Sequence, residues 1–237
     1  MARSWLSSRS RSEGVGLRWA GAFTAAAVIV CAALPAPAMA TGVTGSVRIE
    51  MATIRMDGPK PDRDVVVMLE RIGGPAPPAA SGKVRVDQRG MVFIPHVLAI
   101  QKGTTVTFLN NDREQHNVYF LDEKTGKTLD IGTYGPGVSV DHTFTQPGTV
   151  IALCKLHLEM AAYIVVSDGP WFTTAQLDPT GQVAFSIPNV PPGEYKVSVW
   201  HKKLKPIGLA ERLVVPQSGS VELPIVLTTA SRAKKGR

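Results

Sequence analysis

Short β-type runs separated by Gly and Pro constrain the fold of this chain more than any other feature. Beyond residue 40, runs rich in Val, Ile, Thr and Phe follow one another at short intervals, and the 3.6-residue periodicity of amphipathic helices is scarce. This pattern is typical of an all-β sandwich or barrel. The predicted strands cover residues 45–50, 65–70, 83–86, 91–94, 105–109, 117–120, 139–144, 149–153, 162–167, 172–177, 182–187, 195–200, 212–215 and 221–227.

The first forty residues have the pattern of a secretory signal peptide. Four arginines come first, at positions 3, 9, 11 and 18, and an apolar run follows over residues 19–34. This run is too short and wrongly flanked for a comfortable membrane span, and Ala38-Met39-Ala40 fits the A-x-A cleavage pattern. We predict a signal helix over residues 1–40 that is removed near Thr41, and export to a bacterial periplasm. An uncleaved anchor is the alternative.

The formal net charge of +7 does not indicate nucleic-acid binding. The signal segment and the basic C-terminal tail, residues 231–237, carry the excess of positive charge, so the body between them is close to neutral. A run of basic residues at a chain end is most simply a solvated, disordered tail.

Export leaves Cys154 as the one cysteine of the mature chain, because Cys31 departs with the signal. An odd cysteine in an exported protein is paired between molecules, free and reactive, or a metal ligand. Here His157 and Met160 follow it at C-x-x-H-x-x-M spacing, which strongly favours a metal ligand. A second imidazole, His116, lies upstream.

Two histidines, one cysteine and a weak methionine are the ligand set of a blue-copper site. A single cysteine excludes a Cys-only zinc or iron–sulfur site. We therefore predict one mononuclear type-1 copper ion held by His116, Cys154, His157 and Met160, with no catalytic residues and no other cofactor. His116 is expected at the end of one strand and Cys154 at the end of another.

Two breaks in composition delimit the metal-binding part of the chain. Residues 73–80 are a Gly/Pro/Ala stretch that reads as a linker, and Ser167-Asp168-Gly169-Pro170 is a second break. The predicted copper domain is therefore residues 81–168.

Residues 91–167 resemble the cupredoxin family. The pattern F-x-P at 93–95, G-x-x-V-x-F-x-N-x-D at 103–112 and H-N-V at 116–118 follows the family's order, and the short ligand loop is similar to that of amicyanins and of periplasmic methylamine utilization proteins. The resemblance implies a Greek-key β-sandwich of plastocyanin/amicyanin type. It also implies that Asn117 supports the ligands, with its side chain tying the two ligand loops together and its backbone N–H directed at the Cys154 sulfur.

Two positions depart from the family pattern. Ile151 and Ala152 stand where an aromatic residue is common before the cysteine. Glu159 places a carboxylate in the ligand loop, where a poorly solvated charge would favour Cu(II) and lower the reduction potential.

The flanking segments resemble carboxypeptidase-regulatory-like (transthyretin-like) β-sandwiches. Residues 178–185 and 190–197 carry the turn-and-strand pair of that family, and residues 42–47 and 64–67 resemble its first two strands. We predict one sandwich split in sequence, residues 41–72 and 170–230, with the cupredoxin domain inserted between its second and third strands. Insertion at a loop tip costs little free energy. Two consecutive domains are the alternative.

Two functions fit these residues. The first is a periplasmic carrier of single electrons, docking a dehydrogenase or a c-type cytochrome through the apolar residues Leu156 and Leu158 beside His157. The second is a copper-binding module for delivery, sensing or an envelope scaffold, with no role in electron transfer. The H-x-H strings of multicopper enzymes do not occur, so we predict no enzyme. We expect His96, His142 and His201 to be surface or internally satisfied histidines rather than ligands.

Overall fold

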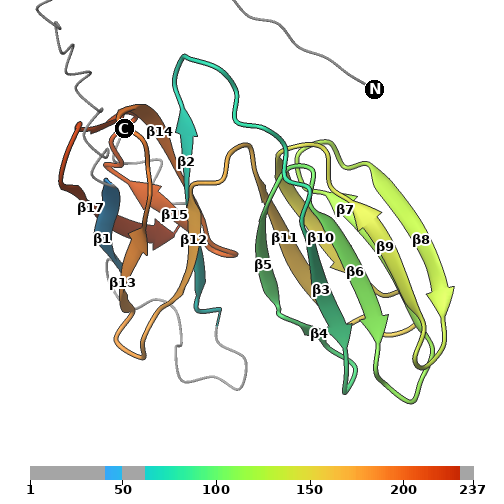
Figure 1. Cartoon of the computed structure of the whole chain (residues 1–237). Helices are drawn as coiled ribbons and strands as arrows, with labels where there is room; N and C mark the ends of the chain where they lie inside the picture. The colour runs from blue at the N-terminus through green and yellow to red at the C-terminus, as the bar shows by residue number, and fades with distance from the viewer. Residues whose placement is uncertain (1–40, 50–61, 230–237) are drawn as a thin grey trace, which may run out of the picture. The chain divides into compact units, whose positions relative to one another are not determined.

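The computed structural model describes residues 41–49 and 62–229. The predicted signal helix and basic tail lie outside these residues. Within the described ranges all regular structure is β-strand, as predicted (Figure 1). The same part of the chain holds no helix with the length and apolar character needed to cross a membrane.

Strands β3–β11 build the sandwich that contains the predicted metal ligands. One sheet has the order β4-β3-β6-β9, and the other has the order β5-β11-β10-β7-β8 (Figure 1). The pairs β3/β6 and β5/β11 are parallel, and the remaining neighbours are antiparallel. The strands are β3 (Lys83–Gln88), β4 (Phe93–Ile94), β5 (Val97–Gln101), β6 (Thr105–Asn110), β7 (His116–Asp122), β8 (Thr128–Tyr134), β9 (Ser139–Thr143), β10 (Gly148–Leu153) and β11 (Ala161–Ser167).

The core of this sandwich forms from alternate residues of its strands, as the two-residue period of a β-strand requires. On β11, Ala162, Ile164 and Val166 point into the core between the two sheets. The intervening Tyr163 and Val165 belong to a separate buried cluster on the other face of the strand. Because both faces are covered, the run is apolar almost without interruption.

The second sandwich combines strands from before and after the metal-binding part. Its sheets have the orders β13-β1-β17-β15 and β12-β2-β14-β16. β1 pairs with β13 on one side and lies parallel to β17 on the other, and β2 lies between β12 and β14. The assignment of this sandwich to the carboxypeptidase-regulatory-like family stays a prediction. Its strands are β1 (Gly42–Ile49), β2 (Asp64–Arg71), β12 (Phe172–Gln176), β13 (Gln182–Ile187), β14 (Gly193–Trp200), β15 (Leu204–Ile207), β16 (Leu213–Val215) and β17 (Ser220–Thr229).

The consecutive valines of β2 show why this strand does not alternate. Val65 and Val67 belong to the core of the second sandwich, whereas Val66 belongs to a smaller cluster with Val97 and Tyr163. All three valines are fully buried. A strand covered on both faces has no polar side, so its sequence reads as a continuous apolar run.

Three strands were not predicted, namely β5, β8 and β15. Most residues of β8 are exposed or half-buried, so its sequence lacks the apolar alternation that marks a strand with one buried face. β15 contains Pro206, which is tolerated because the strand lies at the edge of its sheet. The Gly/Pro/Ala stretch of residues 73–80 forms no strand, although Ala80 N–H donates to the Lys102 carbonyl at 2.9 Å.

Candidate metal centre

Pairing between β7 and β10 brings the distant donors to one end of the sandwich. His116 is the first residue of β7, and Cys154 directly follows β10. The two strands are antiparallel neighbours, with Leu153 opposite Tyr119. The beginning of β7 and the end of β10 therefore meet, as the prediction of two strand-end ligands requires. His157 lies on the loop between β10 and β11.

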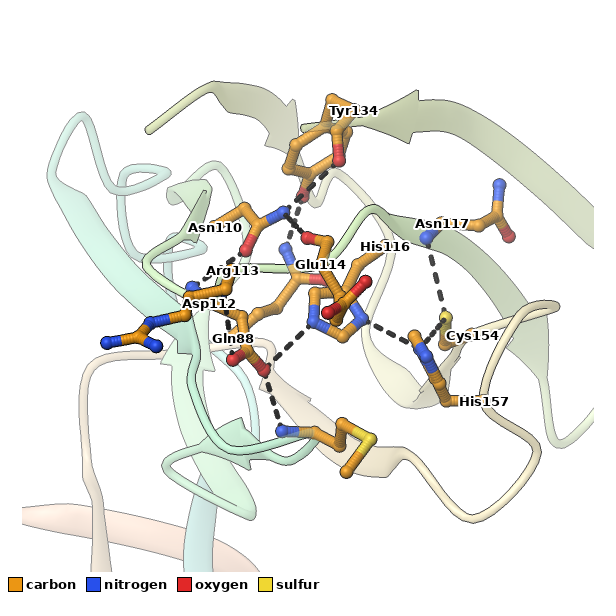
Figure 2. Close-up of polar contacts among 11 residues, drawn as sticks. Gln88, Asn110, Asp112, Arg113, Glu114, His116, Asn117, Tyr134, Cys154 and His157 are labelled. Atoms are coloured by element: carbon orange, nitrogen blue, oxygen red, sulfur yellow. Dashed lines mark hydrogen bonds and ion pairs between the residues drawn. The ribbon is translucent and has the colours of Figure 1, made fainter. Parts of the chain in front are cut away.

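Three predicted ligand atoms converge at this end (Figure 2). The Nδ1 atoms of His116 and His157 are 3.0 Å apart, and the Cys154 Sγ lies 3.8 Å from the His157 Nδ1. All three donor atoms lie within 4.8 Å of one another. Cys154 and His116 are buried, and His157 is half-buried.

The donor set fits a single metal ion. Typical bond lengths at such sites are about 2.0 Å to an imidazole nitrogen and about 2.3 Å to a thiolate sulfur, as at zinc. Two nitrogens that share one ion can therefore be up to about 4 Å apart, which exceeds the observed 3.0 Å. A sulfur and a nitrogen that share one ion can likewise be up to about 4.3 Å apart, and the observed distance is 3.8 Å. Two imidazoles and one thiolate suit copper in both of its common oxidation states.

Met160 lies at the end of the ligand loop. Its side chain is buried in the core of the same sandwich, together with Cys154. The backbone N–H of Met160 donates to the His157 carbonyl at 3.0 Å, which closes a tight turn within the loop. The assignment of its thioether as the weak axial ligand stays a prediction.

Asp112 holds the second ring nitrogen of His116. The His116 Nε2 lies 3.1 Å from the Asp112 Oδ2, and the same oxygen accepts the Met91 N–H at 2.7 Å (Figure 2). The Met91 and His116 hydrogen bonds lower the pKa of Asp112, so it is a carboxylate near neutral pH. An ionised carboxylate only accepts hydrogen bonds, so it favours the tautomer with the proton on Nε2. The lone pair of Nδ1 is then directed at the proposed metal position.

A buried polar network supports the loop that precedes His116. The Asn110 Nδ2 donates to the Glu114 carbonyl at 2.8 Å, and its Oδ1 accepts the Asp112 N–H at 2.9 Å. The Gln88 Nε2 donates to the Tyr134 hydroxyl at 2.8 Å, and that hydroxyl donates to a carbonyl of β6. Buried polar groups with these partners fix one loop conformation rather than several.

Asn117 meets one of the two expectations for it. Its backbone N–H donates a hydrogen bond to the Cys154 Sγ, with 3.4 Å between nitrogen and sulfur. Its side chain does not reach the ligand loop directly. The Nδ2 donates to Asp130, Gly132 and Thr133, all on β8. The family resemblance led us to expect the Asn117 side chain to contact the ligand loop, but it contacts the unpredicted strand β8 instead.

The remaining histidines have other surroundings. His96 Nδ1 lies 3.0 Å from the Ala161 carbonyl, and the ring of His142 packs edge-on against Phe144. The buried His201 accepts two backbone N–H groups through its Nδ1. None of them joins the three-donor cluster found among the described residues.

Sequence reasoning gave no role to Asp130, Lys155, Gln88 or Tyr134. Only Lys155 had a usable signal, because it directly follows the cysteine. The other three lie on strands whose contacts with the ligand loops depend on the pairing of distant segments.

Comparison with known proteins identifies the class of this sandwich. Residues 80–167 match the family described as copper binding proteins, plastocyanin/azurin family. This segment, which contains all four predicted ligands, is a cupredoxin domain, and its cofactor is copper. The matched segment includes none of the strands of the second sandwich.

Two plastocyanins illustrate the similarity. The chain is 35% identical over 86 residues to chloroplastic plastocyanin of Physcomitrium patens, covering 33% of this chain and 51% of that protein. It is 28% identical over 85 residues to plastocyanin of Daucus carota, covering 33% of this chain and 88% of that protein. The chain spans about half the length of the first curated relatives that it matches.

Among solved structures, the chain is similar to amicyanin from Paracoccus versutus. The identity is 23%, the TM-score is 0.33, and the alignment covers 35% of this chain and 79% of amicyanin. A purple cupredoxin from Nitrosopumilus maritimus is 24% identical with a TM-score of 0.33, over 35% of this chain and 99% of that one.

Proposed function

We propose that this chain is an exported carrier of single electrons, with a type-1 copper ion held by His116, Cys154, His157 and Met160. The observation that carries this proposal is the convergence of two imidazole nitrogens and one thiolate sulfur within 4.8 Å, at the end of a strand-anchored sandwich. In this proposal the protein makes and breaks no covalent bonds in a substrate. Its role is to hold one electron and to exchange it with partners.

The bound copper supplies the one-electron couple between Cu(I) and Cu(II). A thiolate with two imidazoles satisfies both oxidation states moderately well, so the ligands need to move little when the charge changes. The protein limits that movement further. His116 is fixed by β7 and by Asp112, and Cys154 is fixed by β10 and by the Asn117 N–H.

His157 is the proposed exit for the electron. It is the half-buried member of the cluster, whereas His116 and Cys154 are buried. The flanking Leu156 and Leu158 are 52% and 86% exposed, so neither side chain is buried against the sandwich. We take these leucines as an apolar docking patch for a redox partner such as a dehydrogenase or a c-type cytochrome. Glu159 is exposed, so water screens its charge and its effect on the potential should be small.

The test is to load the protein with Cu(II) and to record visible absorption and EPR for the wild type, Cys154→Ser and the control His142→Gln. His142 lies in the same sandwich but outside the three-donor cluster. We expect an intense thiolate-to-copper band and narrow hyperfine splitting in the wild type and the control, both lost in Cys154→Ser. A pale spectrum with wide splitting that Cys154→Ser leaves unchanged would overturn the proposal and favour a copper-delivery module.

A further inference from the structure

The Asp130 carboxylate connects two residues that each directly follow a proposed ligand in the sequence. Lys155 directly follows Cys154, and Asn117 directly follows His116. The Lys155 Nζ lies 2.5 Å from the Asp130 Oδ2, and the Asn117 Nδ2 donates to the Asp130 Oδ1 at 2.9 Å. A single carboxylate on β8 therefore joins the ligand loop to the strand that begins with His116.

An irregularity in the pairing of β7 with β8 places this carboxylate. The register shifts between Val118 and Tyr119, so that Val118 lies opposite Gly132 and Tyr119 opposite Asp130. Such bulges redirect side chains beside functional sites. Gly132 has a φ of 115°, a conformation that favours glycine, and its N–H donates to the Asp130 Oδ1 at 2.9 Å.

Among the side-chain contacts of Asn117 and Lys155, the ion pair between Lys155 and Asp130 is the one that links β8 to the ligand loop. The Asn117 Oδ1 is buried and has no hydrogen-bond partner among the described residues. The remaining bonds of its amide go to Gly132 and Thr133, which also belong to β8. Lys155 adds a cation–π contact, with its Nζ 5.5 Å from the centre of the Tyr119 ring.

We propose that Asp130 and Lys155 are positioning residues of the copper centre, which we call the Asp130–Lys155 clasp. The clasp holds the loop after Cys154 against β7 and keeps the Asn117 N–H directed at the Cys154 sulfur. This inference rests on the proposed function, because it concerns the copper centre of an electron carrier. Hydrogen bonding around the cysteine sulfur tunes the potential of such sites, and a donor to the thiolate favours Cu(I).

The experiment compares Asp130→Asn, Lys155→Met and the double variant in the full exported chain. The control is Lys83→Met with Asp141→Asn. That ion pair has a 2.7 Å separation and similar exposure, and it joins β3 to β9 without contacting the ligand cluster. The first readout is hydrogen exchange of the Asn117 amide in the metal-free protein. The second is the visible band, the EPR splitting and the reduction potential of the copper-loaded protein.

We expect faster exchange of the Asn117 amide in both single variants and no change in the control. We also expect an altered copper band and a copper affinity lowered by only about two- to fivefold in both, because the ion pair is partly exposed and neither side chain bonds a ligand directly. The potential should fall most in Lys155→Met, because the loss of the cation and the loss of the hydrogen bond act in the same direction. If Cu(I) alone loses fivefold in affinity, the fall is about 40 mV. The double variant should be no worse than the worse single variant, because residues that act as one unit are not additive.

Two results would overturn the inference. The first is unchanged Asn117 exchange and unchanged spectra in both single variants. The second is a pair of opposite potential shifts that cancel in the double variant while the spectra stay constant, which would mean that the two charges act only at a distance. Neither result bears on whether the wild type forms a type-1 site, and the exchange measurement needs no copper.

Discussion

Replacing Asp112 with alanine should weaken both the fold and the metal centre. The Asp112 Oδ2 accepts from the Met91 N–H and lies against the Nε2 of His116, which is fully buried. Alanine removes both contacts. The imidazole then has no carboxylate to select the tautomer whose Nδ1 lone pair faces the metal position.

The size of the loss in stability depends on whether water can replace Asp112 at each of its two partners, His116 and Met91. Leaving the buried Nε2–H of His116 without an acceptor costs about 1–3 kcal/mol. The Met91 bond is exposed, so water replaces it and the net loss is about 0.5–1.5 kcal/mol. We therefore expect the free energy of unfolding of the metal-free protein to fall by about 1.5–4.5 kcal/mol. Copper affinity should fall about 10- to 100-fold.

Urea unfolding of the metal-free protein and competition with a copper chelator measure the two effects separately. Asp112→Asn is the matched control, because an amide oxygen at the position of Oδ2 keeps the Met91 and His116 contacts while the charge is removed. The amide nitrogen in place of Oδ1 loses only the exposed contact with the Arg113 N–H. It should retain most of the stability. Its reduction potential should rise, because one negative charge near the copper is lost. If Asp112→Ala unfolds like the wild type and binds copper equally well, Asp112 does not position His116.

Three further predictions follow from other parts of the chain. Leu158→Lys should slow electron self-exchange between oxidised and reduced copies without changing the copper spectrum. The control Leu129→Lys, at an exposed apolar site on β8, should leave the self-exchange rate unchanged. Equal rates in the two variants would contradict a docking patch at His157. Gly45→Ala should lower the free energy of unfolding by about 1–3 kcal/mol through overpacking while leaving the copper band intact, because the new Cβ would lie 2.1 Å from a backbone oxygen of β17. The Lys155 hydrogen bond, helped by the Gly132 N–H, lowers the pKa of Asp130 from 3.8 to about 2. The clasp should therefore stabilise the fold fully above about pH 4 and progressively less as the pH falls toward 2, so a stability difference between wild type and Asp130→Asn that persists at pH 2 would contradict this.

The parts of the site that are local in sequence could be predicted from sequence. Cys154, His157 and Met160 share one short loop, so their proximity needs no knowledge of the fold. The strands β7, β10 and β11 have apolar runs long enough to be recognised, and they place His116 and Cys154 at strand ends. The copper reading depended only on donor chemistry and spacing.

The tertiary structure decided which distant residues support those donors. Asp130 lies on β8, a strand that sequence did not indicate because most of its residues are exposed. Its bonds to Asn117 and Lys155 exist only because β8 pairs with β7 around a bulge. The parallel pairing of β1 with β17 is equally invisible in the sequence. Residue types and short spacings fix what a loop can bind, but the register between distant strands depends on packing across the whole sandwich, so only the folded chain determines the contacts made there.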